Sequence, residues 1–200
     1  MQVTIDKQYP VAAGAEAAWK VLTNIPELTT CMPGAQIIEQ IDATHFKGSV
    51  RVKVGPAVAA FAGNIEVLSV DAAARTLRML GKGADKSGSS ASMELTATLA
   101  PAADGTSTLQ GRADVIVNGK FAQFGGRMMT SVSDMILGQF AEAFSEKTHA
   151  LEEAERSTVS TSTSPDRPAM SAGAARELNG LSLLLGLLRR WFLGLFGRKS

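Results

Sequence analysis

The sequence predicts an α+β fold in which a seven-stranded antiparallel sheet wraps around one long helix and leaves a hydrophobic cavity between them. Six β-forming segments follow one another between residues 36 and 117, separated only by short turns. After Asn118 the spacing of apolar residues changes to that of a helix. One further strand and a helix pair precede these segments, and together the elements fit a sheet packed on a helix. Because Ala, Gly and Met are frequent in the facing segments, we expect the concave side to stay incompletely filled.

The first elements are a strand and two short helices. Apolar and polar residues alternate from Gln2 to Tyr9, which predicts a strand that ends at Pro10. A helix is expected from Ala12 to Thr23, because four apolar residues follow the 3.6-residue period: Ala15, Ala18, Trp19 and Leu22. Asn24 and Pro26 close this helix, and a second helical turn follows at Ile25 to Thr30.

The middle of the chain is β-forming throughout. Its six segments are IIEQI, HFKGSVRVKV, VAAFAGNIEVLSV, RTLRMLGKGA, SASMELTATLA and TLQGRADVIV. Each alternates or clusters β-forming residues, and Gly, Pro and Asp mark the turns between them. Short turns between successive strands predict an antiparallel meander.

A long helix is expected from Asn118, which can cap its first turn, to about Glu155. Its apolar residues mark one face at helical spacing: Phe121, Phe124, Met128, Val132, Met135, Ile136, Phe140 and Phe144. Gly125 and Gly126 then fall inside the helix, where each costs about 1 kcal/mol relative to Ala. We therefore expect either a close approach of the sheet or a ligand that passes where side chains are missing.

The rest of the chain divides into a linker and an amphipathic helix. Residues 156–176 are rich in Ser, Thr and Pro, which predicts a flexible linker. In residues 177–200, Arg189 and Arg190 interrupt the apolar run before it reaches the roughly 20 residues of a membrane span. The segment is expected to lie in the membrane interface, with docking on a partner protein or on the domain itself as the alternative. The expected membrane-binding residues are Leu181, Leu184, Leu185, Leu188, Trp191, Phe192, Leu195 and Phe196.

Composition narrows the function classes. The chain has 20 basic and 19 acidic residues, and no basic run interleaved with aromatics occurs in its first 150 residues, so we expect no nucleic-acid binding. The start, QVTIDKQYPV after Met1, lacks the features of a secretory signal. The protein is therefore expected in the cytoplasm, peripherally bound to the cytoplasmic face of the inner membrane. Cys31 is the only cysteine, which excludes an internal disulfide.

No catalytic or metal-binding pattern stands out. His45 and His149 are the only histidines, and neither has metal-ligand spacing with Cys31. We therefore expect no metal site and no catalytic residue, and we expect that the protein is not an enzyme. The enzymatic alternative would need a carboxylate such as Asp114 or Asp134 in an apolar cavity, with a raised pKa.

Three motifs, in order, carry a family resemblance. They are Cys31-Met32-Pro33-Gly34, then Val52-Lys53-Val54-Gly55-Pro56 with the following Phe61-Ala62-Gly63, and Gly119-Lys120-Phe121-Ala122-Gln123-Phe124-Gly125-Gly126-Arg127. Together they resemble the carbon monoxide dehydrogenase accessory family known as CoxG over residues 1 to about 153. The resemblance implies a START-like (SRPBCC) helix-grip fold. It also implies a small accessory protein that brings a molybdenum-dependent carbon monoxide dehydrogenase, or a related molybdenum hydroxylase, to the inner membrane.

The motifs also have purely structural interpretations. Pro33 and Gly34 end a helical turn and reverse the chain, and Gly55 and Pro56 form a strand-to-strand turn. On the functional interpretation, residues 1–155 form a ligand-binding domain whose cavity accepts a hydrophobic small molecule. Its expected ligand-binding residues are Phe61, Phe121, Phe124, Gly125, Met128, Met129 and Met135, although a Met or Phe stripe also suits plain core.

The candidate ligand is an isoprenoid quinone, which can take the electrons that carbon monoxide oxidation releases. No other cofactor is expected. The alternatives are a membrane anchor or an assembly factor without a ligand, and a small helix-grip enzyme.

Overall fold

The computed structural model describes residues 1–55 and 57–162, which form seven strands, three α-helices and one 3-10 helix. Their order along the chain is β1 (Gln2–Val11), α1 (Ala15–Thr23), α2 (Ile25–Cys31), β2 (Ala35–Gln40), β3 (His45–Val54), β4 (Ala57–Asp71), β5 (Thr76–Ala84), β6 (Ser90–Pro101), β7 (Ser107–Asn118), η1 (Gly119–Phe124) and α3 (Gly125–Ser162). The predicted α+β class and its seven strands are confirmed.

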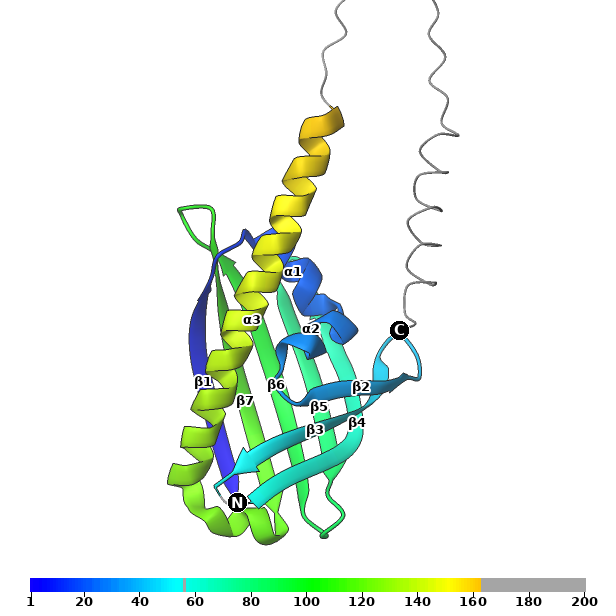
Figure 1. Cartoon of the computed structure of the whole chain (residues 1–200), viewed down its shortest axis with the longest axis vertical. Helices are drawn as coiled ribbons and strands as arrows, with labels where there is room; N and C mark the ends of the chain where they lie inside the picture. Colours follow the sequence, from blue (N-terminus) through cyan, green and yellow to red (C-terminus); the bar gives the residue numbers. More distant parts are fainter. Residues whose placement is uncertain (56, 163–200) are drawn as a thin grey trace, which may run out of the picture. The chain divides into compact units, whose positions relative to one another are not determined.

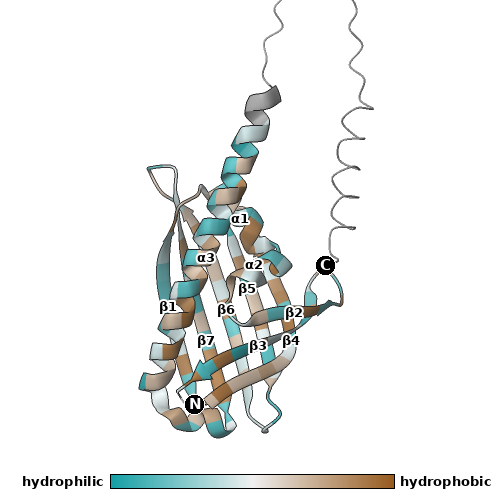
Figure 2. Cartoon of the chain, viewed as in Figure 1, coloured by the Kyte–Doolittle hydropathy of each residue, from teal (hydrophilic) through white to brown (hydrophobic). Residues whose placement is uncertain are grey.

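One antiparallel sheet contains all seven strands, in the order β1-β7-β6-β5-β4-β3-β2. Strands β2 to β7 form the expected meander, and β1 pairs with β7 along its whole length, from Gln2 opposite Ile116 to Val11 opposite Ser107. The sheet curves, and α3 lies across its concave face together with α1 and α2 (Figure 1). Figure 2 shows hydrophobic and hydrophilic residues alternating along the strands, as a sheet with one covered face requires.

Local sequence signals determine the turns around the two short helices. Asn24 caps the N-terminus of α2, because its side-chain oxygen accepts a hydrogen bond from the Glu27 N–H at 3.3 Å. Pro26 lies in the first turn of this helix. Gly34 has a φ of +76°, and a Cβ there would lie 2.2 Å from the carbonyl oxygen of Arg51. Only glycine fits that position, which confirms the tight reversal predicted from Pro33 and Gly34.

The main core lies between α1, α2, the second half of α3 and the part of the sheet that these helices cover. Phe144 of α3 and Leu77 of β5 are both 0% exposed at its centre. The other buried members are Val11, Ala13, Ala17, Ala18, Val21, Leu22, Ile25, Leu28, Cys31, Phe46, Met79, Ala97, Leu99 and Leu109. Burial of these side chains is the dominant stabilising contribution, at about 25 cal/mol per Å² of apolar surface.

The long helix differs from its prediction at both ends. It begins at Gly125, not after Asn118, because residues Gly119–Phe124 form the separate 3-10 helix η1. The Asn118 side chain makes no capping hydrogen bond. Gly125 has a φ of +77°, so it is the joint between η1 and α3 and not a helix-interior residue. At the other end α3 continues to Ser162, into the segment that was expected to be linker.

Candidate functional site

A row of half-buried residues crosses the middle of the concave face. The pairing register aligns them on five neighbouring strands: Ile65 (β4), Gly81 (β5), Met93 (β6), Val115 (β7) and Val3 (β1). We call this the central row. All five residues are intermediate in exposure, whereas the main core on one side and a second cluster on the other contain fully buried residues. The sheet is thus only partly covered along this row.

Two glycines confirm that space remains over this face. Nothing lies within 4 Å of the position that a Cβ would take on Gly81, and the same holds for Gly111 on β7. Gly111 shares the concave face, because its partner in the register is the buried Ala97. Strand glycines on a covered face commonly mark a place where another group approaches closely. Here no described protein group fills that place.

The first half of α3 covers the sheet loosely. No residue from 125 to 140 is fully buried, whereas Ala141, Phe144 and Thr148 in the next two turns are. Its inward residues Met129 and Val132 are partly buried against the second cluster. The apolar side chains of the central row and the inward residues of the first half of α3 are therefore both only partly covered.

The second cluster adjoins the central row at Val115, which belongs to both, and we call it the aromatic cluster. The Phe121 ring lies 5.7 Å from the Phe61 ring and 6.0 Å from the Phe124 ring, centroid to centroid. Phe121 is 1% exposed, whereas Phe61 and Phe124 are half-buried. The other members are Val52, Val54, Ala57, Ala59, Ala91, Val115, Val117, Met129 and Val132. Aromatic pairs in this tilted arrangement pack favourably.

The structure brings four of the seven expected ligand-binding residues together. Phe61, Phe121, Phe124 and Met129 all belong to the aromatic cluster. Sequence spacing could not show that Phe61 joins the other three, because the contact is made across the sheet.

The other three expected residues lie outside the cluster. Met128 is 37% exposed, with its Sδ and Cε at 3.5 Å from the position of a Cβ on Gly55 in the β3–β4 turn. Met135 is 50% exposed on α3, and Gly125 is exposed at the η1–α3 joint. Met135 therefore lies apart from the aromatic cluster that contains Phe61, Phe121, Phe124 and Met129.

An ion pair joins the edge of the sheet to the loosely packed part of α3. Lys7 of β1 lies in register with Gly111, and its Nζ is 2.9 Å from Asp134 Oδ1. The hydrogen bond from Lys7 to Asp134, reinforced by the carboxylate charge, raises the pKa of the lysine above its usual value. Both side chains remain nearly half exposed. The sequence did not single out Lys7 or Gly81 as site residues. For Gly81 the available signal was a glycine inside a β-forming segment.

A separate groove lies between α1, α2 and the second half of α3. It has a volume of about 810 Å³ and is open to solvent, with Val21, Cys31, Ala143, Ala150 and Leu151 among its apolar residues. Lys20, Glu27, Glu146 and Lys147 also line it. Burial raises the pKa of the Cys31 thiol, which disfavours the reactive thiolate and agrees with a structural role.

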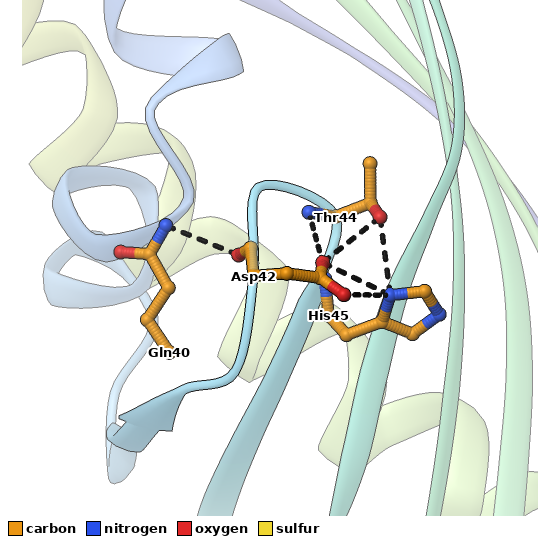
Figure 3. A network of polar contacts seen from close by, with 4 residues as sticks. All are labelled: Gln40, Asp42, Thr44 and His45. Atoms are coloured by element: carbon orange, nitrogen blue, oxygen red, sulfur yellow. Dashed lines mark hydrogen bonds and ion pairs between the residues drawn. The ribbon is translucent and has the colours of Figure 1, made fainter.

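A network of polar contacts occupies the turn between β2 and β3 (Figure 3). Asp42 accepts hydrogen bonds from the Thr44 N–H at 2.7 Å and the His45 N–H at 2.8 Å, and His45 Nδ1 lies 3.0 Å away. These bonds, the Thr44 N–H first, lower the Asp42 pKa to about 2. The network holds an exposed turn together.

The carboxylates of the enzymatic alternative do not point into an apolar cavity. Asp114 is exposed and accepts a hydrogen bond from the Thr4 hydroxyl at 2.6 Å, and Asp134 is engaged by Lys7. Within residues 1–55 and 57–162, no group of three or more His, Cys, Asp or Glu side chains is arranged to hold a metal ion. In the same part of the chain no helix has the length and hydropathy needed to cross a membrane.

The comparison that decides the family is the match of residues 8–149 to the model of the carbon monoxide dehydrogenase family CoxG. The chain belongs to the CoxG family. The matched segment includes β2 to β7 and η1, and it ends within α3. CoxG membership identifies the chain with a family of accessory proteins and, by the family's name, with carbon monoxide dehydrogenase. Comparison with the curated proteins finds no matching sequence.

Solved structures similar to this CoxG chain share its fold. A conserved protein from Geobacillus kaustophilus has a TM-score of 0.67 at 19% identity, covering 74% of this chain and 96% of its own. A START superfamily protein from Mycobacterium smegmatis has a TM-score of 0.55 at 16% identity, covering 74% and 98%. The Zhui aromatase/cyclase from Streptomyces sp. R1128 has a TM-score of 0.52 at 15% identity, covering 81% and 99%. At these identities the likeness establishes the START-like helix-grip fold and nothing about the reaction.

Proposed function

We propose that this CoxG protein is a membrane-associated accessory protein that carries an apolar ligand for a molybdenum-dependent carbon monoxide dehydrogenase or a related molybdenum hydroxylase. One observation carries the proposal: the central row is apolar and half-buried, and open space remains above Gly81. A domain of this size normally fills its core to the density of an organic crystal. Space left over an apolar face is therefore more consistent with a ligand site than with core packing alone.

An isoprenoid quinone is the ligand that suits the partner's chemistry. Oxidation of carbon monoxide to carbon dioxide releases two electrons, and a quinone takes up two electrons and two protons. Its isoprenoid chain confines it to the bilayer, so a soluble enzyme needs either access to the membrane or a carrier. Phe61 and Phe124, the two half-buried rings of the aromatic cluster, would pack against a planar head, and the apolar central row suits the chain.

Membrane association is proposed from the sequence of the tail. Leu178 to Phe196 is an amphipathic segment, which lies outside the described residues. Such segments bind at the headgroup level with the apolar side inward, and Trp191 suits that depth. The cytoplasmic face of the inner membrane is the proposed location. A linker within residues 163–176, which lie outside the described residues, would let the domain reach the enzyme.

The experiment that tests ligand binding is native mass spectrometry of the full chain, expressed in a quinone-producing host, followed by solvent extraction of the purified protein. We expect an isoprenoid quinone to be retained. Gly81→Leu should fold normally, because its side chain enters open space, but should retain much less quinone. Lys82→Leu is the matched control, since it changes the adjacent residue, which is exposed and points away from the concave face.

Two results would contradict the carrier proposal. The first is a wild-type chain that retains no quinone and shows no saturable binding when quinone is added. The second is equal retention by Gly81→Leu and wild type. The first result would leave the tail and the partner-binding surface as the function, and the protein would then act as an anchor or an assembly factor.

A further inference from the structure

One end of the sheet is strongly basic. The β3–β4 turn, the β5–β6 turn and η1 meet there, at the lower end of the sheet in Figure 1. The exposed cationic side chains on these segments are Arg51, Lys53, Lys86, Lys120 and Arg127, and we call them the basic end. They come from four segments that are far apart in the sequence, so the pattern of charges along the chain did not reveal them.

Two contacts bring these segments together. Lys120 Nζ lies 3.8 Å from Asp85 Oδ2, which joins η1 to the β5–β6 turn. The Met128 Sδ lies 3.5 Å from the position that a Cβ would take on Gly55, which joins the start of α3 to the β3–β4 turn. Both contacts lie at the same end of the sheet, so the five cations share one surface.

Little negative charge offsets this surface. Asp85 is the only acidic residue within residues 49–60, 84–90 and 118–130, and its side chain is only 8% exposed. Among the residues that the structure describes, Lys120 alone of the five cations forms an ion pair. The other four present unpaired charges to the solvent.

The long helix increases this contrast. The first turn of α3 contains no acidic residue, so its N-terminal N–H groups add about half a positive charge at the basic end. Its second half is acidic, because residues 141–156 contain five glutamates and two basic residues. The helix is about 57 Å long at 1.5 Å per residue, and its two ends therefore differ in charge.

Two exposed apolar side chains lie among the cations. Val58 is 48% exposed and is the cross-strand partner of Lys53. Met128 is 37% exposed and follows Arg127 in the chain. Arg and Met are enriched in protein interfaces, where apolar side chains in the middle are surrounded by a polar rim. The basic end has this composition.

The connectivity of α3 favours a protein over a membrane as the occupant of this surface. The chain leaves α3 at Ser162 toward the proposed membrane-binding tail, whereas the basic end lies at the first turn of the same helix. A domain tethered through the C-terminal end of α3 can present the other end to a soluble enzyme. Charge complementarity then calls for an acidic patch on that enzyme.

We propose that the basic end is the docking surface for an acidic patch on the molybdenum-dependent dehydrogenase. This inference rests on the proposed function, which supplies the partner, and it adds the surface and the chemistry of recognition. The unpaired cations steer the enzyme onto this end, because oppositely charged patches associate faster than neutral ones. The inner face of the same β3–β4 hairpin belongs to the aromatic cluster, so the enzyme docks next to expected ligand-binding residues.

The test measures association of the full chain with the purified carbon monoxide dehydrogenase of the same organism by biolayer interferometry, at about 0.05 M and about 0.5 M salt. Arg51→Glu with Lys53→Glu should lower the association rate constant about tenfold at the lower salt concentration and much less at the higher one. Lys82→Glu with Arg112→Glu is the matched control, because it changes the net charge equally at two exposed strand residues outside the basic end. This control should change the rate constant far less.

A second double variant separates docking from folding. Lys86 lies in a turn, so Lys86→Glu alters no strand pairing. Arg127→Glu places an acidic residue in the first turn of α3, where a negative charge suits the helix dipole. The variant with both changes should therefore keep the urea midpoint of the wild type and still associate about tenfold more slowly.

Vesicles of phosphatidylglycerol provide the membrane comparison. Both basic-end variants, as full chains, should sediment with these vesicles as the control variant does. Weaker sedimentation than the control would identify the basic end as a lipid-binding surface and would overturn the docking role.

The remaining outcomes separate this inference from the proposed function. If the wild type binds the enzyme and the basic-end variants associate as fast as the control, the docking surface lies elsewhere while the proposed function stands. If the wild-type chain does not bind the enzyme at either salt concentration, the proposed partner fails, and the docking surface fails with it.

Discussion

Asp42 shows how one side chain controls a turn. Its folded-state pKa of about 2 lies below the ordinary value of 3.8, because the bonds from Thr44 and His45 favour the carboxylate. A depressed acid pKa contributes stability above the unfolded value, and this contribution is lost as the pH falls through the folded value. We therefore expect the urea midpoint of the wild type to decrease as the pH is lowered from about 4 to about 2. The Asp42→Asn variant should show a smaller decrease over the same range. Identical pH profiles for the two proteins would contradict this assignment.

Phe144 and Met135 lie on the same helix but in opposite environments. Phe144 is 0% exposed and stacks on Phe140 at 5.7 Å between centroids, whereas Met135 is 50% exposed. Phe144→Ala should lower the free energy of unfolding by about 3–5 kcal/mol, because it leaves a cavity in the main core. Met135→Ala should change it by less than about 0.5 kcal/mol. Urea unfolding followed by circular dichroism measures both, and similar losses for the two variants would contradict the assignment of the core.

At the scale of elements, the two halves of α3 should differ in dynamics. Residues 125–140 include no buried side chain, whereas the following turns anchor the helix in the main core. The Lys7–Asp134 pair is an added restraint on the loose half. Asp134→Asn should therefore speed amide hydrogen exchange in residues 126–137 and leave residues 141–150 unchanged, and high salt should shrink the difference. Uniform exchange along α3 in both proteins would show that the helix packs evenly.

The sequence predicted the elements better than their boundaries. Alternation and turn residues determined every strand, because a half-covered strand repeats with a period of two. The joint at Gly125 could not be predicted, since Phe121 and Phe124 keep helical spacing whether they stand on a 3-10 or an α-helix. Ser157 and its Ser/Thr neighbours suggested a linker, yet α3 continues through them to Ser162. Composition shows that such residues bury little apolar surface; it does not show where a helix ends.

At the scale of the molecule, the fold was predictable and the site only in part. Phe121, Phe124 and Met129 could be grouped by their spacing along one segment. The central row, however, joins residues of β4, β5, β6, β7 and β1 that only the register brings together.

The last prediction concerns the tail. Removing residues 164–200 should leave a folded domain, because the described residues through Ser162 already contain the sheet, the main core and the aromatic cluster. The full chain should sediment with vesicles that contain anionic lipid, and the shortened chain should stay in the supernatant. Arg198 and Lys199 add about 1 kcal/mol each at an anionic surface, so sedimentation should weaken with salt.

A full-length control separates the apolar contribution from chain length. Leu184→Asp with Leu188→Asp keeps the linker and every basic residue but interrupts the expected apolar side, so this variant should also stay in the supernatant. Its urea midpoint should match that of the wild type, because both changes lie outside the folded domain. Equal sedimentation of the shortened and full chains would place membrane binding on the domain itself, and the tail would then need a different role, such as docking on the partner enzyme.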